Sequence, residues 1–326
     1  MTWSVVQADA VEFMDSLPTD SVDLVLGSPP YMDARTYQDG TLPKGAVTVR
    51  DCQEWVDWML NVSEAAVRVS RGLVLWVVAG VQREGVYWPG CEGLMWEWWK
   101  RGNHLWCPCV WWKVDEYEGG TGIPGSGGNV PGQRWLRKDW EYVVCFKKPG
   151  GIPYDMPTNM GHEPIFSHVG GEMSNRTADG KRANERRGYN VGSDPERRRA
   201  WKNGTCKDVT ARKANGERKD ETYVMPKVAN PGNVLPIVVK SRVGGGHMGS
   251  PLCHENEAPY PEDLAEFFVL CYSAPSTTVL DCFLGSGTTG AVSVRHGRNF
   301  LGCDLRQSQV ELSRKRISQE TPVLFS

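Results

Sequence analysis

The chain has 326 residues, a formal net charge of −2 and 40% hydrophobic residues. This length exceeds one typical domain and suits one α/β domain with a sizeable insertion, so two lobes are expected. The sequence has no apolar run of eighteen residues, and its first residues lack the basic and then apolar build of a signal peptide. We therefore expect a soluble, cytoplasmic protein whose ten cysteines, which lack metal-ligand spacing, are reduced thiols of the core.

The first predicted elements are a strand at residues 5–7, a short helix at 10–17 and a buried strand at 22–26. The third element runs into Ser28, Pro29, Pro30 and Tyr31, where it must end because proline cannot donate to a sheet. Each proline also has a fixed φ, so the proline carbonyls and the Ser28 hydroxyl form a rigid row of acceptors beside the Tyr31 ring. Such a row suits a planar amine, and the plainer alternative is a proline-terminated strand with a tyrosine in the core.

The middle of the chain is rich in tryptophan, with six of the fourteen between residues 96 and 112. Core packing is the preferred interpretation, and a stacking surface for nucleic-acid bases is the alternative. Before this stretch, the apolar pattern predicts a helix at 51–70 and a strand at 72–79. The polar residues 32–50 are interpreted as a loop that either closes over a ligand or is merely solvated, and the glycine-rich residues 118–133 as a flexible loop.

The composition changes between residues 176 and 227. This segment carries fifteen Lys or Arg against eight Asp or Glu, a charge of +7 that leaves the rest of the chain at −9. Clustered Lys and Arg neutralise phosphates and Arg can read guanine edges, so the segment is a candidate nucleic-acid-binding region, although a charge run alone is more typical of a solvated insertion. The residues expected to bind nucleic acid are Arg186, Arg187, Arg197, Arg198, Arg199 and Lys202.

A second motif follows a helix predicted at residues 258–272. Residues 278–290 read Thr-Val-Leu-Asp-Cys-Phe-Leu-Gly-Ser-Gly-Thr-Thr-Gly, an apolar strand that enters a Gly-x-Gly turn and then a helix. The next strand ends at Asp304, and a basic helix runs to residue 317. Glycines let the backbone approach a ligand, and a carboxylate after the second strand can accept both hydroxyls of a ribose. The spacing therefore predicts a nucleoside site.

The two motifs, in this order and with a region between them, resemble those of the S-adenosylmethionine-dependent DNA amino-methyltransferases of the beta class. The resemblance covers residues 1–150 and 230–316, and it includes Gln7-Ala8-Asp9-Ala10, Trp140-Glu141-Tyr142-Val143 and the segment 254–261. It implies that Ser28, Pro29, Pro30 and Tyr31 are the catalytic residues. It implies cofactor contacts from Asp9, Ala10, Asp281, Phe283, Gly285, Ser286, Gly287, Thr288 and Asp304. Cys282 departs from the family, which usually has proline there.

The expected fold class is α/β, a Rossmann-like and mostly parallel sheet flanked by helices, which is the class I methyltransferase fold. Residues 1–150 and 230–326 are assigned to the catalytic and cofactor-binding domain, and 151–229 to a basic DNA target-recognition insertion. The resemblance implies S-adenosylmethionine as cofactor, S-adenosylhomocysteine as product, no metal, and duplex DNA as substrate. It is consistent with a cognate restriction endonuclease as a second partner, with a monomer or weak homodimer, and with a nucleoid-associated protein of bacterial or phage type.

The expected reaction is the direct in-line transfer of a methyl group to the exocyclic amine of a base flipped out of the duplex. Ser before Pro-Pro is typical of family members that modify cytosine N4, so N4-methylcytosine is preferred and N6-methyladenine is the alternative. No cysteine nucleophile is needed, unlike in ring-carbon methylation. Three other classes stay open: a catalytically inactive DNA-binding protein of this fold, an RNA or protein-glutamine methyltransferase, and a nicotinamide enzyme.

Overall fold

The computed structural model describes residues 2–32, 52–83, 86–115, 139–162, 228–240, 250–252 and 259–321. Three predicted features fall outside these ranges: the loop after Met32, the glycine-rich residues 118–133 and the basic segment 176–227. The six residues expected to bind DNA also lie outside them, namely Arg186, Arg187, Arg197, Arg198, Arg199 and Lys202. Within the described ranges, no helix is both long and apolar enough to cross a membrane.

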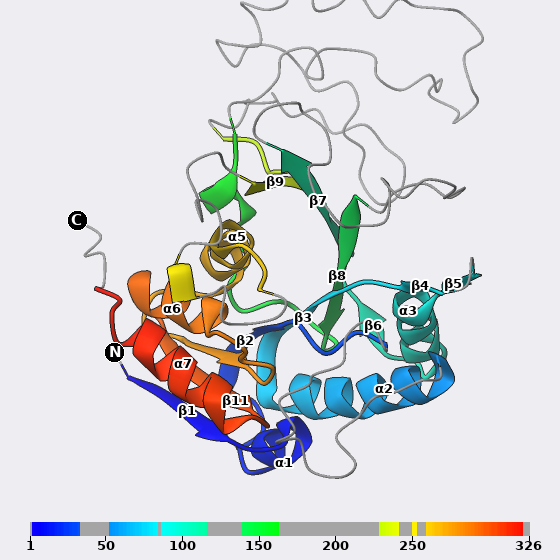
Figure 1. The fold of residues 1–326 in the computed structure, drawn as a ribbon. Coiled ribbons are helices and arrows are strands. Elements are labelled where there is room, and N and C mark those ends of the chain that lie inside the picture. Colours follow the sequence, from blue (N-terminus) through cyan, green and yellow to red (C-terminus); the bar gives the residue numbers. More distant parts are fainter. Residues whose placement is uncertain are drawn as a thin grey trace, which may run out of the picture. The chain divides into compact units, whose positions relative to one another are not determined.

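Among the described residues, a nine-stranded sheet runs in the order β1-β11-β10-β2-β3-β8-β7-β9, with β6 paired to β8 (Figure 1). Its strands are β1 (Trp3–Gln7), β2 (Val22–Gly27), β3 (Ser70–Val78), β6 (His104–Leu105), β7 (Cys109–Asp115), β8 (Trp140–Lys147), β9 (Val234–Lys240), β10 (Thr278–Asp281) and β11 (Asn299–Asp304). The five strands from β1 to β3 are parallel neighbours, and β9 is parallel to β7. Strand β8 is antiparallel to β3, β6 and β7. The expected mostly parallel sheet is thus confirmed, with one strand reversed.

Helices cover both faces of this sheet. One face packs against α1 (Ala10–Asp15), α2 (Cys52–Val69) and α3 (Gly90–Lys100), and the other against α5 (Glu262–Tyr272), α6 (Thr288–Arg295) and α7 (Gln307–Ile317) (Figure 1). Strand β3 divides its side chains between the two cores with a period of two, because Val74 and Trp76 join the first core and Leu75 and Val77 the second. The remaining elements are the ribbon of β4 (Val81–Arg83) and β5 (Val86–Trp88) and the 3-10 helix η1 (Pro157–Met160).

Most predicted elements differ from the observed ones only at their ends, and the differences have local causes. The helix expected at 258–272 begins at Glu262, because Pro261 before it is extended, with φ −63° and ψ 147°. The helix expected at 10–17 ends at Asp15. The strand expected at 72–79 begins already at Ser70, directly after α2 ends at Val69. Apolar periodicity therefore predicts where the elements lie, whereas the start of α5 after the extended Pro261 is not visible in that periodicity.

The tryptophan-rich stretch does not belong to one core. Trp98 and Trp111 are buried, but Trp96 and Trp99 on α3 are 58% and 57% exposed. Core packing thus explains only part of this stretch. The expectation that the cysteines are core thiols is likewise wrong for Cys107, which is exposed.

By its internal contacts the chain divides into two units, residues 1–159 with 232–326, and residues 160–231. The first unit contains the sheet and the helices given above. Of the second unit the structure describes only the ends of its chain, where His162 and Ala229 form an isolated antiparallel bridge. The target-recognition role expected for residues 151–229 stays a prediction.

Candidate active site

The predicted catalytic and cofactor residues lie at one edge of the sheet, where the parallel strands end. Asp304 ends β11, Asp281 ends β10, and Ser28 follows β2. From β10 the chain continues to β11 on one side, and from β2 it continues to β3 on the other, so the strand order reverses between β10 and β2. In open α/β sheets, ligands bind at such a switch point.

The acceptor row at the end of β2 is held by two other elements. The Ser28 hydroxyl donates to the carbonyl of Val77 on β3 at 2.9 Å. The carbonyl of Pro30 accepts from Trp55 Nε1 on α2, also at 2.9 Å. A hydroxyl has one hydrogen and two lone pairs, so a Ser28 that donates to Val77 presents only lone pairs to a ligand. An amine N–H is a matching partner for such a group.

The ring of Tyr31 is fixed at its far end. Its hydroxyl donates to Glu141 Oε2 on β8 at 2.6 Å, and the other oxygen of Glu141 forms a short ion pair with Lys113 on β7. Burial, together with the charge of Glu141 and this hydrogen bond, raises the pKa of Tyr31 well above its usual range. The phenol is therefore neutral and remains a donor.

Asp281 joins the catalytic strand to the cofactor strand. Gly27 of β2 lies so close that a Cβ there would be 2.6 Å from Asp281 Oδ1. Oδ1 accepts from the amide of Phe283 at 2.9 Å and Oδ2 from the Thr289 hydroxyl at 2.8 Å, while Thr289 is in short contact with the Tyr260 hydroxyl. The Asp281 side chain is 1% exposed, and this burial raises its pKa to about 7. This carboxyl therefore keeps its proton to a higher pH than an ordinary aspartate does.

The glycine-rich turn after β10 uses backbone conformations that favour glycine. Gly285 and Gly287 have φ values of 49° and 79°, and a Cβ on Gly287 would lie 2.8 Å from the Cβ of Ser313. The amide of Gly285 donates to Asp304 Oδ2 at 3.0 Å, and the amide of Arg306 donates to Oδ1 at 2.9 Å. Nε of Arg306 also lies 3.5 Å from Oδ1. A carboxylate oxygen has two lone pairs, so Oδ2, which accepts from Gly285, can also accept from a ribose hydroxyl.

Asp9 and Ala10 lie after β1 at the same edge of the sheet. Asp9 Oδ1 accepts from the amides of Val11 and Glu12 at 2.8 Å and 3.2 Å, which caps the start of α1. Ala10 is buried in the core of that face. In this structure Asp9 thus caps α1 and Ala10 packs in the core. Both residues lie where the family resemblance implies contacts with the cofactor.

Cys282 and Phe283 follow β10. The glycine-rich turn at residues 283–288 is here called the cofactor turn, and Cys282 directly precedes it. The ring of Phe283 lies edge to face against Trp58 and Trp76, with centroids 5.8 Å and 5.7 Å apart. Cys282, where the family usually has proline, is 2% exposed, and burial raises the pKa of its thiol well above the usual range. A buried neutral thiol is not a nucleophile. The departure from proline therefore adds no reactive group to the site.

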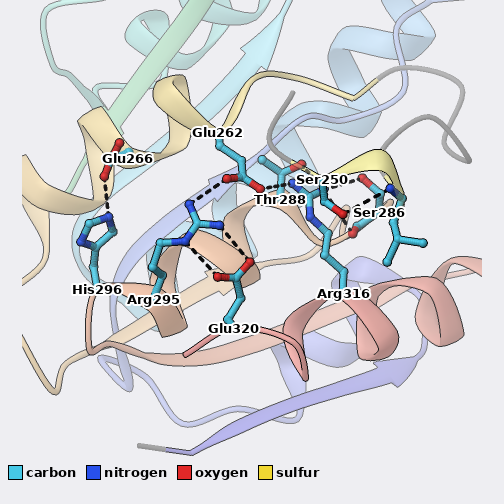
Figure 2. Close-up of polar contacts among 10 residues, drawn as sticks. Ser250, Glu262, Glu266, Ser286, Thr288, Arg295, His296, Arg316 and Glu320 are labelled. Carbon is cyan, nitrogen blue, oxygen red and sulfur yellow. Dashed lines mark hydrogen bonds and ion pairs between the residues drawn. The ribbon is translucent and has the colours of Figure 1, made fainter. Parts of the chain in front are cut away.

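Arg316 of α7 contacts the cofactor turn from the interior of the protein (Figure 2). Its Nη1 donates to Ser286 Oγ at 3.1 Å and to Thr288 Oγ1 at 3.0 Å. Both hydroxyls act as acceptors here, so each keeps its own hydrogen for another partner. Arg316 is only 1% exposed, which makes this contact part of the protein interior.

The same guanidinium belongs to a network that joins three helices (Figure 2). Nη2 of Arg316 pairs with Glu262 at the start of α5 at 2.6 Å. Glu262 also pairs with Arg295 at the end of α6 at 2.7 Å, and Arg295 contacts Glu320 through two nitrogens at 2.9 Å and 2.8 Å. The turn is thus tied to α5, α6 and α7 by charged groups.

The sequence motifs contain neither the groups that hold Tyr31 nor those that hold the cofactor turn. Glu141 stands in the segment 140–143, which carries part of the family resemblance, and Arg316 in the basic helix predicted to run to residue 317, but neither position predicts the contact that the side chain makes. In the structure Leu312, Arg316 and Ile317 are among the buried residues of α7. Arg316 follows Leu312 by four residues, a helical spacing that places both on one face, and this is the signal that the sequence contains.

Comparison with known proteins identifies the family. The model of N6 and N4 methyltransferases, described as DNA methylase, matches residues 22–315. The type II methyltransferase M.BglII of Bacillus subtilis is 22% identical over 316 residues, which are 97% of this chain and 69% of that protein. The type II methyltransferase M1.MboII of Moraxella bovis is 50% identical over 52 residues only, which are 16% of this chain and 20% of that protein.

Two solved structures share the fold. The putative DNA modification methylase TTHA0409 from Thermus thermophilus, in complex with S-adenosyl-L-methionine, is 21% identical with a TM-score of 0.55 over 98% of this chain and 95% of that one. The PvuII DNA methyltransferase, described as cytosine-N4-specific, is 18% identical with a TM-score of 0.61 over 97% of this chain and 86% of that one.

The chain therefore belongs to the DNA methylase family of N6 and N4 amino-methyltransferases. It has the class I methyltransferase fold, as these two solved structures do. The family resemblance and the fold class expected from the sequence are both confirmed.

Proposed function

We propose that this protein methylates the N4 amine of cytosine in duplex DNA. The observation that carries the proposal is the Ser28 hydroxyl, a neutral group that donates to Val77 and so offers only lone pairs at the switch point. A neutral hydroxyl accepts less strongly than a carboxylate, so it orients an amine without a strong pull on its proton. Ser at this place is typical of cytosine-N4 members of the family. Adenine N6 is the alternative target, because it is also a conjugated exocyclic amine.

In the proposed reaction, a cytosine rotated out of the duplex lies against the ring of Tyr31. Its amine donates to Ser28 Oγ and to the carbonyl of Pro29, while Pro30 is held by Trp55. These two acceptors orient the nitrogen lone pair toward the methyl group, which S-adenosylmethionine supplies on a sulfonium sulfur. The N–C bond forms as the S–C bond breaks, and the amine then loses one proton.

The proposed cofactor residues are Asp9, Ala10, Asp281, Phe283, Gly285, Ser286, Gly287, Thr288 and Asp304. Support comes from their common position at the ends of neighbouring parallel strands and from the left-handed glycines of the turn. Asp304 is proposed to accept the ribose hydroxyls in addition to its contacts with the amides of Gly285 and Arg306 and with the Arg306 guanidinium.

Duplex DNA is proposed as the substrate because residues 176–227 carry a charge of +7. Arg186, Arg187, Arg197, Arg198, Arg199 and Lys202 are proposed to bind it. The relatives are bacterial type II methyltransferases. We therefore also propose a cognate endonuclease as a partner and a location at the bacterial nucleoid. The proposed oligomeric state is a monomer or weak homodimer.

The deciding experiment is mass spectrometry of nucleosides from unmethylated DNA incubated with the protein and S-adenosylmethionine. We expect N4-methylcytosine. N6-methyladenine without N4-methylcytosine would reassign the target base. Neither product, with cofactor and DNA both shown to bind, would refute the enzyme activity.

Substitution of Ser28 tests the acceptor row itself. Ser28→Ala removes one acceptor and should slow methyl transfer by roughly 10–1000-fold, with little change in cofactor affinity. Ser16→Ala is a matched control, because Ser16 also donates to a backbone carbonyl, that of Phe13 at 2.6 Å, but at the exposed end of α1. Equal single-turnover rates for the two variants would reject Ser28 as a catalytic residue.

A further inference from the structure

Glu141 makes contacts for which the sequence motifs give no role. It lies on β8 opposite Trp111 of β7, and its two carboxylate oxygens contact Tyr31 and Lys113. The side chains of Glu141 and Lys113 are 12% and 15% exposed. Nζ of Lys113 also lies 4.7 Å from the ring centroid of Trp111, which is buried. A continuous series of contacts thus leads from the sheet to the ring of the proposed catalytic tyrosine.

These contacts fix the direction of the Tyr31 side chain. A tyrosine held only at its backbone can still change χ1, and a hydrogen bond at the para hydroxyl restricts this rotation because it anchors the far end of the ring axis. The bond from Tyr31 to Glu141 is 2.6 Å long and has a charged acceptor, which places it among the stronger hydrogen bonds. Lys113 in turn fixes the orientation of Glu141, so two strands together determine the position of the ring.

The turn at residues 28–31 is here called the catalytic turn. Two other groups of this turn are also oriented by hydrogen bonds. Ser28 is held by Val77 of β3, and the Pro30 carbonyl is held by Trp55 of α2. Ser28, Pro30 and Tyr31 therefore each have a partner on a different element. A partly buried ion pair is weak evidence for stabilisation, because desolvation opposes the Coulomb attraction, so orientation explains the ion pair better than stability does.

The geometry also argues against an acid–base role for Glu141. Oε2 already accepts from Tyr31, and Oε1 is already paired with Lys113. The pKa of Tyr31 is raised by burial and by Glu141, so the phenol keeps its proton over the working range of pH. Glu141 is thus equipped to hold a neighbour in place and not to take a proton from the substrate.

We infer that Glu141, oriented by Lys113, is a positioning residue that holds the Tyr31 side chain in the direction that places its ring beside the flipped base. The inference rests on the proposed base flipping and methyl transfer and deepens it. It adds residues of the reversed strand β8 and its neighbour β7 to the support of the target-base pocket.

The test compares Tyr31→Phe, which keeps the ring and removes the hydroxyl, with Glu141→Gln and with the double variant. Single-turnover methyl transfer to unmethylated plasmid DNA is measured with the full chain, and S-adenosylmethionine affinity is measured by titration. Each single variant should slow transfer by about 10–100-fold and change the cofactor Kd less than about twofold. Because both act through one hydrogen bond, the double variant should be about as slow as the slower single variant.

Glu64→Gln is the matched control, since Glu64 pairs with Arg101 at 2.8 Å on the exposed surface, and its transfer rate should not change. If the unsubstituted protein transfers methyl groups and Tyr31→Phe does so equally fast, the positioning role is wrong and the proposed function stands. Effects that multiply in the double variant would also overturn it. If Glu141→Gln does not fold, the rate of Tyr31→Phe alone decides. No transfer by the unsubstituted protein would instead refute the proposed function.

Discussion

The catalytic turn at residues 28–31 and the cofactor turn at residues 283–288 follow neighbouring strands but are held in different ways. The catalytic turn contains two prolines, and Ser28, Pro30 and Tyr31 contact β3, α2 and β8, respectively. The cofactor turn contains glycines in left-handed conformations, and Arg316 holds it from behind. In the proline-containing turn, whose backbone is already restricted, the contacts orient the polar groups. In the glycine-containing turn, whose backbone is more flexible, the contacts hold the backbone in its folded conformation.

The burial of the charged groups follows this difference. Lys113 and Glu141 retain some contact with solvent, whereas Arg316 and Glu262 are 1% and 9% exposed. Loss of a partner is costliest where the remaining charge cannot reach water. Substitutions behind the cofactor turn should therefore act mainly on stability, and substitutions around the catalytic turn mainly on rate.

The largest effect is expected for Arg316→Met, which leaves Glu262 with one of its two cationic partners and frees Ser286 and Thr288. The free energy of unfolding should fall by about 3–5 kcal/mol, measured by urea unfolding. Arg101→Met is the control, because it breaks an exposed ion pair with Glu64 and should cost less than about 1 kcal/mol. Equal losses in the two variants would show that the buried network does not stabilise the turn.

The next effect concerns Asp281, whose pKa is raised by burial to about 7. The folded protein therefore binds a proton here more tightly than the unfolded chain, whose Asp titrates near about 4. Stability from this group is complete below about pH 4 and is lost as the pH rises to about 7, by up to about 4 kcal/mol. The difference in unfolding free energy between the unsubstituted protein and Asp281→Asn should follow this trend between pH 5 and 8. A difference that does not vary with pH would contradict the raised pKa.

A smaller effect is expected at the cofactor. Asp304→Ala should weaken S-adenosylmethionine binding by about 1–3 kcal/mol in a calorimetric titration, because the ribose hydroxyls lose their acceptor. Asp304→Asn keeps one acceptor oxygen and should lose less. Ser28→Ala, on the catalytic turn, should leave this affinity unchanged. Unaltered binding by Asp304→Ala would exclude Asp304 as the ribose ligand.

Much of the fold follows from local sequence patterns. The strand before Ser28 is a short apolar run, and the helix before Ser70 repeats its apolar residues at helical spacing, so the sequence predicts both and the structure confirms them. The direction of the reversed strand β8 cannot be predicted in this way, because alternation of side chains is the same in parallel and antiparallel strands.

The sequence predicts the residues of the candidate site that face a ligand, but not the residues that hold them in place. Residues that face a ligand stand together in short motifs, as Ser28 to Tyr31 do, and spacing alone can reveal them. Glu141 and Arg316 act on those motifs from distant positions, and they meet their partners only once the sheet has formed. A charged residue in a strand or helix is usually solvated, so its burial is knowable only from the tertiary structure.

The pairing of β2 with β10 has a consequence for synthesis of the chain on the ribosome. Besides the strand pairing, the amide of Thr278 donates to Asp23 across 255 residues of chain. At about 5–20 residues per second, β2 waits roughly 13–50 s for this neighbour after it has been made. During that time one edge of its backbone stays open to other strands. The catalytic turn and the cofactor turn therefore cannot meet until the chain has been made as far as residue 288.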